Sequence, residues 1–201
     1  MACMLSEISE REDVVMADTI IIGDGPGGLS AALFLARADQ DVFVFGQDKT
    51  AMHWAQLNNY LGVVSTHGAE FQKFSREQVG AAGATIRDEQ ISTIEKAREG
   101  FAVTTEAGDR LECRHLILSE GEKPRLAQTI GLVKNADGAI PVDENSRSDI
   151  PDVYVVGRST RPGRSQAIIS AGDGAAAAID ILSRIAGKAV CDWDLPPSDG
   201  D

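Results

Sequence analysis

Short apolar runs, broken by glycine or by charged residues, alternate along this chain with longer segments of helical period. Residues 18–23 (DTIIIG) and 41–46 (DVFVFG) are continuous apolar runs, which are typical of strands buried on both faces. The segment between them, GGLSAALFLARA at 27–38, has helix-forming composition. This order predicts a strand, a glycine turn, a helix and a second parallel strand, joined by a right-handed crossover.

The middle of the chain predicts an amphipathic helix followed by a small antiparallel unit. In residues 68–83, the apolar Phe71, Phe74 and Val79 fall on or near one helical face. Strand-like pieces follow at 84–94, 101–113 and 115–121, with a Gly-Asp turn signal inside the second piece. We expect this unit to return the chain to the parallel sheet at residues 115–119.

The last part of the chain holds another buried strand pattern at 151–157 and the longest helical pattern at 165–187, where Gly187 can end the helix. Together the elements predict an α/β fold of Rossmann-like type: three layers, a parallel central sheet and a small antiparallel β unit. The expected organisation is an acidic arm at 1–17, one domain at 18–187 and an irregular tail at 188–201.

Charge and cysteine usage narrow the possible partners. The 201 residues include 31 Asp and Glu against 19 Lys and Arg, a net charge of −12, which disfavours nucleic acid and anionic membranes as ligands. No apolar run approaches the roughly 18 residues of a membrane span. Cys3, Cys113 and Cys191 form no Cys-x-x-Cys pair, so we expect neither a disulfide framework nor a metal site, and a cytoplasmic location.

The strongest motif is Gly-x-Gly-x-x-Gly, formed by Gly23, Gly25 and Gly28 between the first strand and the first helix. Gly23 allows the tight turn, Gly25 lets a pyrophosphate approach the backbone, and Gly28 permits close contact of helix and strand. The helix that begins near Pro26 directs its free N–H groups toward that phosphate. The motif predicts a dinucleotide site; the alternative is a structural turn in an unrelated parallel sheet.

The acid that normally bonds the adenosine ribose is missing from its expected place. The second strand ends at Gly46 and Gln47, where dinucleotide-binding folds carry Asp or Glu. Asp48 is a weak substitute, and Gln47 can also bond a hydroxyl.

Five segments, in the correct order, resemble the FAD domain of thioredoxin reductase and related two-domain flavoprotein disulfide reductases. They are the glycine loop with its helix, NNYLG at 58–62, HLILSEG at 115–121, the stretch at 131–157 and RSQAIISAGDGAAAAI at 164–179. The resemblance covers nearly all of residues 18–187. It implies that FAD is the cofactor and that the chain acts in redox chemistry.

By this resemblance, FAD extends from the glycine loop, past an Asn segment, to the start of the last helix. The residues implicated in binding are Gly23, Gly25, Pro26 and Gly27 at the pyrophosphate, Gly28 as the third glycine of the motif, Gln47 and Asp48 near the adenosine, Asn59 beside the flavin, Gly121, Gly157 and Arg158 at strand ends, and Arg164, Ser165, Gln166 and Ala167 at the isoalloxazine ring. N–H groups at a helix start stabilise the negative charge of a reduced ring. Ordinary capping is the alternative for Ser165 and Gln166, and packing is the alternative to flavin contact for His53, Trp54 and Tyr60.

Three departures from the family bear on activity. The nicotinamide domain, which the family inserts between segments ending here near Arg125 and beginning near Thr129, is replaced by a few residues, and its redox Cys-x-x-Cys is absent. Cys113 is expected to be a buried strand residue. Arg158 replaces the Asp that bonds the ribitol. Because a guanidinium only donates, Arg158 either reaches a phosphate oxygen and strengthens binding or intrudes on the ribitol and weakens it; Glu120 could pair with it.

We therefore expect a homodimeric, single-domain FAD oxidoreductase that receives electrons from a partner protein or a diffusible reductant rather than from bound NADPH. The alternative is a non-catalytic nucleotide-binding or partner-regulating module derived from a flavoprotein reductase. A subunit completed by a nicotinamide-binding partner is a third possibility. The sequence indicates no catalytic residue, no metal ligands and no substrate.

Overall fold

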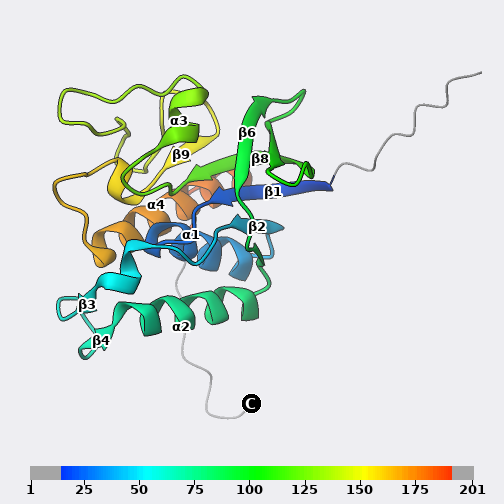
Figure 1. Cartoon of the computed structure of the whole chain (residues 1–201). Helices are drawn as coiled ribbons and strands as arrows, with labels where there is room; N and C mark the ends of the chain where they lie inside the picture. The colour runs from blue at the N-terminus through cyan, green and yellow to red at the C-terminus, as the bar shows by residue number, and fades with distance from the viewer. Residues whose placement is uncertain (1–14, 192–201) are drawn as a thin grey trace, which may run out of the picture.

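The computed structural model describes residues 15–191, which are built around one seven-stranded sheet (Figure 1). Its strands lie in the order β5-β2-β1-β8-β7-β6, and β9 pairs with β8. The strands are β1 (Val15–Ile22), β2 (Val42–Phe45), β5 (Thr85–Arg87), β6 (Ile91–Lys96), β7 (Phe101–Thr105), β8 (Arg110–Leu118) and β9 (Val153–Val155). A separate antiparallel pair joins β3 (Gln56–Leu57) to β4 (Thr66–His67).

Strand β8 links the parallel and antiparallel parts of the sheet because its two halves have different neighbours. Its first half is antiparallel to β7, with Phe101 opposite Cys113, and its second half is parallel to β9, with Leu116 opposite Val153. Strand β1 pairs in parallel with β8 on the opposite edge of β8 from β7 and β9. The predicted parallel sheet with a small antiparallel unit is thus confirmed, although the expected break at Arg114 is absent because β8 continues through it.

Four α-helices and two 3₁₀-helices complete the described chain. They are α1 (Pro26–Arg37), α2 (Gly68–Ala81), α3 (Arg125–Thr129), α4 (Ala167–Ala186), η1 (Ala51–Trp54) and η2 (Gly157–Ser159). Helices α1, α2 and α4 lie on one side of the parallel strands, while α3 and the antiparallel end of the same sheet, β6 and β7, lie on the other side (Figure 1). This gives the three predicted layers. Helix α4 ends at Gly187, which has the left-handed φ of 64° that favours glycine.

The continuous apolar runs are explained by burial on both faces of the sheet. In β1, Ile20 and Ile22 belong to the core beneath the antiparallel unit, whereas Ile21 belongs to the core beneath the helices. The predicted apolar face of α2 is only partly correct, because Val79 is buried but Phe74 is 59% exposed. Helix α2 packs against both α1 and η1, and it buries only Gly68, Gln72 and Val79.

The structure covers only part of the regions where the predicted domain begins and ends. Strand β1 starts at Val15, three residues before the expected start of the domain, so residues 15–17 of the predicted arm belong to the sheet. The rest of that arm, residues 1–14, and residues 192–201 of the tail lie outside the described residues. Within residues 15–191, no helix is long and apolar enough to cross a membrane.

Candidate functional site

A cavity of about 510 Å³ opens where β1, β2, β8 and β9 end. Gly23, Gly46 and Ser119, which directly follow β1, β2 and β8, line it, and so does Gly157, two residues after the end of β9. In open α/β sheets, the carboxyl ends of parallel strands are where ligands bind, because the loops there diverge to the two faces. The volume lies within the range of small-molecule and cofactor sites.

The glycine loop is held by backbone contacts that leave no room for a side chain at Gly23 or Gly28. Gly23 has φ 106°, its N–H donates to the Phe45 carbonyl at 2.7 Å, and a Cβ on it would lie 2.1 Å from the Ser119 carbonyl oxygen. A Cβ on Gly28 would lie 2.0 Å from the Gly23 carbonyl oxygen. A Cβ on Gly25 meets nothing within 4 Å. The outer two glycines therefore permit the turn, and the middle one leaves the loop open to a ligand.

Ser119 fixes this loop from the neighbouring strand. Its N–H donates to the Ile22 carbonyl at 2.7 Å, and its hydroxyl accepts from the N–H of Gly28 at 3.2 Å in the first turn of α1. The sequence did not single out Ser119, because the contact joins residues 91 positions apart.

Two helices begin at the cavity without side-chain caps. Gly25 precedes α1 and Gln166 precedes α4, and neither position caps its helix through a side-chain hydrogen bond. The first N–H groups of such helices have no partner within the helix and favour anionic ligands. The Gln166 side chain instead accepts from the Asn59 amide at 3.0 Å. The alternative reading of Gln166 as an ordinary cap therefore does not hold for its side chain.

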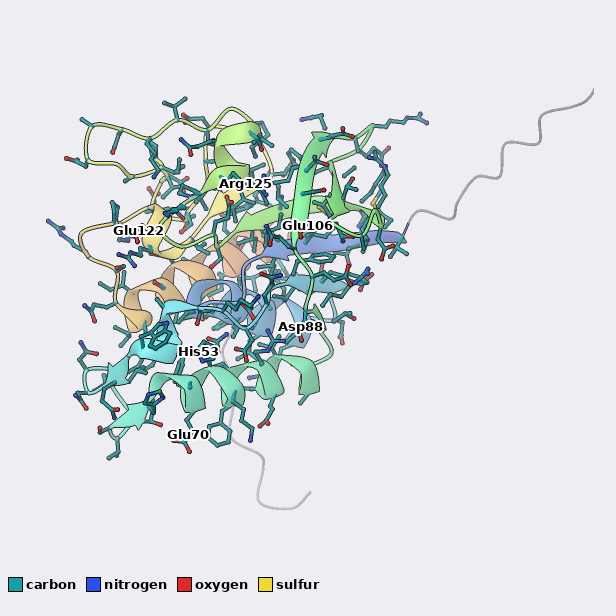
Figure 2. The ribbon with its side chains drawn as sticks, in the orientation of Figure 1. His53, Glu70, Asp88, Glu106, Glu122 and Arg125 are labelled. Atoms are coloured by element: carbon teal, nitrogen blue, oxygen red, sulfur yellow. The ribbon has the colours of Figure 1, made fainter. Side chains whose placement is uncertain are left out.

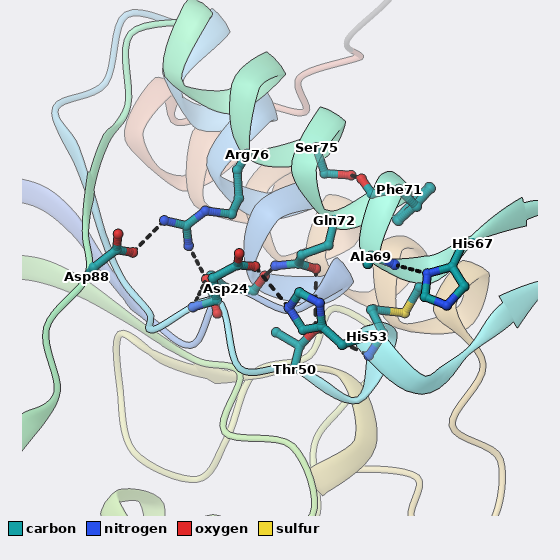
Figure 3. A network of polar contacts seen from close by, with 12 residues as sticks. Asp24, Thr50, His53, His67, Ala69, Phe71, Gln72, Ser75, Arg76 and Asp88 are labelled. Carbon is teal, nitrogen blue, oxygen red and sulfur yellow. Dashed lines mark hydrogen bonds and ion pairs between the residues drawn. The ribbon is translucent and has the colours of Figure 1, made fainter.

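A polar network fixes the part of the cavity after β2 (Figure 3). The buried Asp24 carboxylate forms an ion pair with Arg76, which also contacts Asp88 at 2.5 Å, and it accepts the N–H of Asp48 at 3.0 Å. Gln72, which is fully buried, donates to the Asp24 carbonyl at 2.6 Å. These contacts tie α2 to the glycine loop and hold the segment that follows Gly46.

Arg158 lies in the cavity with a different partner from the one expected. Its guanidinium is 3.3 Å from the carboxylate of Glu122, which is labelled in Figure 2, and its Nε is buried without a hydrogen-bond partner among the described residues. Glu120 accepts from the N–H groups of Leu126 and Ala127, at 2.7 and 2.8 Å, at the start of α3. The expected pairing of Glu120 with Arg158 is therefore replaced by the Glu122 contact. Burial raises the pKa of Glu120, although both N–H groups favour its charged form.

Most of the predicted binding residues come together in the cavity. Those that line it are Gly23, Gly25, Pro26, Gly27, Gln47, Gly121, Gly157, Arg158, Ser165, Gln166 and Ala167. The other four predicted residues are not part of the lining. Gly28 lies beneath the loop, and Asn59 donates to Gln166, which does line the cavity. Asp48 contacts His53 at 3.2 Å, and Arg164 is exposed. The individual roles of these residues in FAD binding stay predictions.

Several lining residues were missed by sequence reasoning. They are Asp24, Gly46, Lys49, Thr50, Ala51, Met52, Ser119, Glu122 and Ser170. A partial signal was available, because Gly46 and Ser119 lie in the last positions of the predicted strand segments 41–46 and 115–121. The others depend on how the loops fold over the cavity.

The aromatic residues and cysteines outside this lining have other surroundings. Trp54 is 91% exposed, and the Tyr60 ring packs against Phe71 with ring centroids 5.3 Å apart. Cys113 is a fully buried strand residue, as expected, and burial raises the pKa of its thiol to about 12, which makes it unreactive. Among residues 15–191, no cluster of His, Cys, Asp or Glu could hold a metal ion.

The glycine loop, the open helix starts and the cavity at the strand ends define a dinucleotide-binding domain of Rossmann type. Residues 18–59 match the family model described as FAD binding domain, and residues 60–174 match the one described as pyridine nucleotide-disulphide oxidoreductase. The second match covers more than half of the chain. The chain belongs to the pyridine nucleotide-disulphide oxidoreductase family, and FAD is its cofactor.

Curated relatives give the same assignment. The thioredoxin reductase of Spironucleus barkhanus is 26% identical over 145 residues, which are 69% of this chain and 48% of that protein. The bifunctional thioredoxin reductase/thioredoxin of Mycobacterium leprae is 31% identical over 118 residues, 57% of this chain and 26% of that protein. A ferredoxin–NADP reductase of Bradyrhizobium diazoefficiens is 32% identical over 54% of this chain and 34% of that protein. The chain thus spans at most about half the length of these relatives.

Solved structures confirm the fold. A thioredoxin reductase from Gloeobacter violaceus has a TM-score of 0.79 at 16% identity, covering 89% of this chain and 99% of that chain. The atypical thioredoxin reductase TRi from Desulfovibrio vulgaris Hildenborough has a TM-score of 0.76 at 20% identity, covering 88% of this chain and 100% of that chain. The predicted α/β fold of the thioredoxin reductase FAD domain is confirmed.

The residues present fit FAD. Gly25 leaves room for a pyrophosphate, α1 and α4 begin at the cavity without side-chain caps, and the Arg158 Nε is a buried donor with no acceptor among the described residues. An unpaired buried donor costs free energy, so a ligand oxygen beside it would be stabilising.

Proposed function

We propose that this chain is an FAD-dependent oxidoreductase module whose flavin receives electrons from a separate protein or a diffusible reductant rather than from bound NADPH. The observation that carries the proposal is the connection between β8 and β9. It consists of the five-residue helix α3 and loops, which pack Leu126, Ala127 and Ile140 into the core. The resemblance places the inserted nicotinamide domain of the family at this point.

Bound FAD supplies two-electron transfer at its isoalloxazine ring. The residues of this chain would bind and orient the cofactor. The glycine loop and the start of α1 would face the pyrophosphate, and the start of α4 at Ser165, Gln166 and Ala167 would face the ring, where its N–H groups stabilise negative charge. The bond between Asn59 and Gln166 would hold the Gln166 side chain to one side of that helix start.

An anaerobic absorbance titration of the purified, FAD-loaded chain tests this electron supply. NADH and NADPH are expected to bleach the flavin only slowly and without saturation, because the connection between β8 and β9 leaves no nicotinamide domain at that point. Dithionite or photoreduction is expected to bleach it fully. Rapid, saturable bleaching by NADPH would overturn the proposal. A chain that takes up no flavin on reconstitution would favour the alternative, a non-catalytic nucleotide-binding or partner-regulating module.

The proposed homodimer, or a redox partner protein, requires an exposed surface near the flavin. Trp54, Leu61 and Val64 are 91%, 90% and 93% exposed, on the segment that follows the cavity residues Ala51 and Met52. Exposed apolar side chains on one segment favour a protein-protein contact. Light scattering tests the dimer, which a monomer at micromolar concentration would contradict. The cytoplasmic location rests on the cysteine usage and stays a prediction.

The role of Arg158 can be decided by substitution. Since no described residue bonds its buried Nε, we expect Arg158 to donate to a cofactor oxygen. Arg158→Met should then weaken FAD binding by about tenfold or more, which corresponds to the loss of a charged hydrogen bond of about 1.5 to 3 kcal/mol. Fluorescence titration with FAD measures the change, and Arg98→Met, on the exposed β6–β7 turn, is the matched control. Tighter binding by Arg158→Asp would show instead that Arg158 intrudes on the ribitol.

A further inference from the structure

The position of the missing ribose acid is occupied by a carboxylate from elsewhere in the chain. A Cβ built on Gly46, where dinucleotide-binding folds carry the acid, would lie 2.2 Å from Cγ of Asp24 and 2.6 Å from its Oδ1. We propose that Asp24, between the first two glycines of the loop, is the relocated ribose acid of this site and accepts a hydroxyl of the adenosine ribose. The inference rests on the proposed FAD site.

The contacts of Asp24 leave one carboxylate oxygen for a ligand. Its side chain is 4% exposed and lines the cavity. Its Oδ2 accepts the Asp48 N–H at 3.0 Å and forms the ion pair with Arg76. No residue of the described chain forms a hydrogen bond with Oδ1, which is the oxygen nearer to Gly46. A carboxylate oxygen accepts hydroxyl hydrogens, which is the task of the usual acid.

Arg76 acts as a positioning residue for this carboxylate. Asp24 is buried, and Arg76 provides the positive charge that pairs with its carboxylate inside the fold. Asp88 holds the other side of the guanidinium, and Gln72 fixes the Asp24 backbone (Figure 3). The carboxylate is therefore presented at a defined place beside Gly46.

The two possible acids exclude each other sterically. With Asp24 in place, any side chain at position 46 would overlap its carboxylate, so this site requires glycine there. Conversely, a short residue at position 24 would free the space for an acid at position 46. If Asp24 is the ribose acid, removing it or adding an acid at position 46 should each impair the site, and the two changes together should restore it. If Asp24 only holds the loop in place, the double substitution should restore nothing.

The experiment measures how well ADP, 2′-deoxy-ADP and 3′-deoxy-ADP displace FAD from the native chain and its variants. The native chain is expected to prefer ADP over at least one deoxy analogue by about fivefold to tenfold, the effect of one hydrogen bond. Asp24→Ser and Gly46→Glu should each reduce this preference to about onefold and weaken FAD binding. The double variant should regain both properties. Glu77→Ser, which removes an exposed acid of α2, is the control.

Equal displacement by all three nucleotides in the native chain would overturn the inference, and so would a double variant no better than Gly46→Glu alone. Thermal unfolding of each FAD-free variant checks that it is folded. Rapid reduction by NADPH would contradict the proposed electron supply without changing these affinities. A native chain that binds no FAD would overturn both proposals. Each of these outcomes is different, so failure of the Asp24 inference can be distinguished from failure of the proposed function.

Discussion

Gly174→Ala is expected to lower the free energy of unfolding by about 1 to 3 kcal/mol, the usual cost of overpacking a close contact. A Cβ on Gly174 would lie 2.0 Å from the Gly27 carbonyl oxygen and 3.1 Å from the Ala31 backbone nitrogen, so α1 and α4 touch backbone to backbone at this point. The methyl group would push the helices apart. Because Gly27 lies in the first turn of α1, we also expect weaker FAD binding. Urea unfolding with and without FAD measures both effects.

Gly172 provides the matched control two residues earlier in the same helix. A Cβ on Gly172 meets nothing within 4 Å, and the residue is exposed. Gly172→Ala should therefore raise the free energy of unfolding by about 0.5 to 1 kcal/mol, because alanine loses less conformational freedom in a helix. Equal effects of the two substitutions would show that the helix contact is not the cause.

The different surroundings of Gly172 and Gly174 could not be predicted from the sequence. Both fall in the segment that was predicted as a helix and compared with the last helix of the family, and the helix is confirmed at Ala167–Ala186. Which glycine faces α1 depends on the packing of residues almost 150 positions apart. A local pattern contains no signal for such a contact.

The candidate site likewise has parts that the sequence predicts and parts that it does not. The glycine loop and the start of the last helix were predictable because their residues are adjacent in sequence and each has a backbone task. Asp24 was not, because its role follows from Arg76 and from the space at Gly46. The pairing of Arg158 with Glu122 was missed because α3, which binds Glu120, is five residues long and has no clear periodic pattern.

Gly28→Ala is expected to destabilise the fold severely, by about 3 kcal/mol or more, at the upper end of overpacking effects. Its Cβ would lie 2.0 Å from the Gly23 carbonyl oxygen and 3.2 Å from Cγ2 of Ile21. Neither neighbour can move freely, since Gly23 donates to Phe45 within the turn and Ile21 is fully buried in β1. Thermal unfolding of the FAD-free chain measures the loss, and unchanged stability would contradict the close contact.

Gly25→Ala should separate ligand binding from stability in the same loop. Gly25 has φ −71° and ψ 177°, which alanine adopts without strain, and its Cβ would meet nothing within 4 Å. The free energy of unfolding of the FAD-free chain should therefore change by less than about 0.5 kcal/mol. The new methyl group would stand in the cavity where a pyrophosphate approaches the backbone, so FAD binding should weaken about tenfold or more, which corresponds to about 1.4 kcal/mol. Fluorescence titration with FAD measures this loss, and native affinity in Gly25→Ala would show that the pyrophosphate does not approach the loop at this residue.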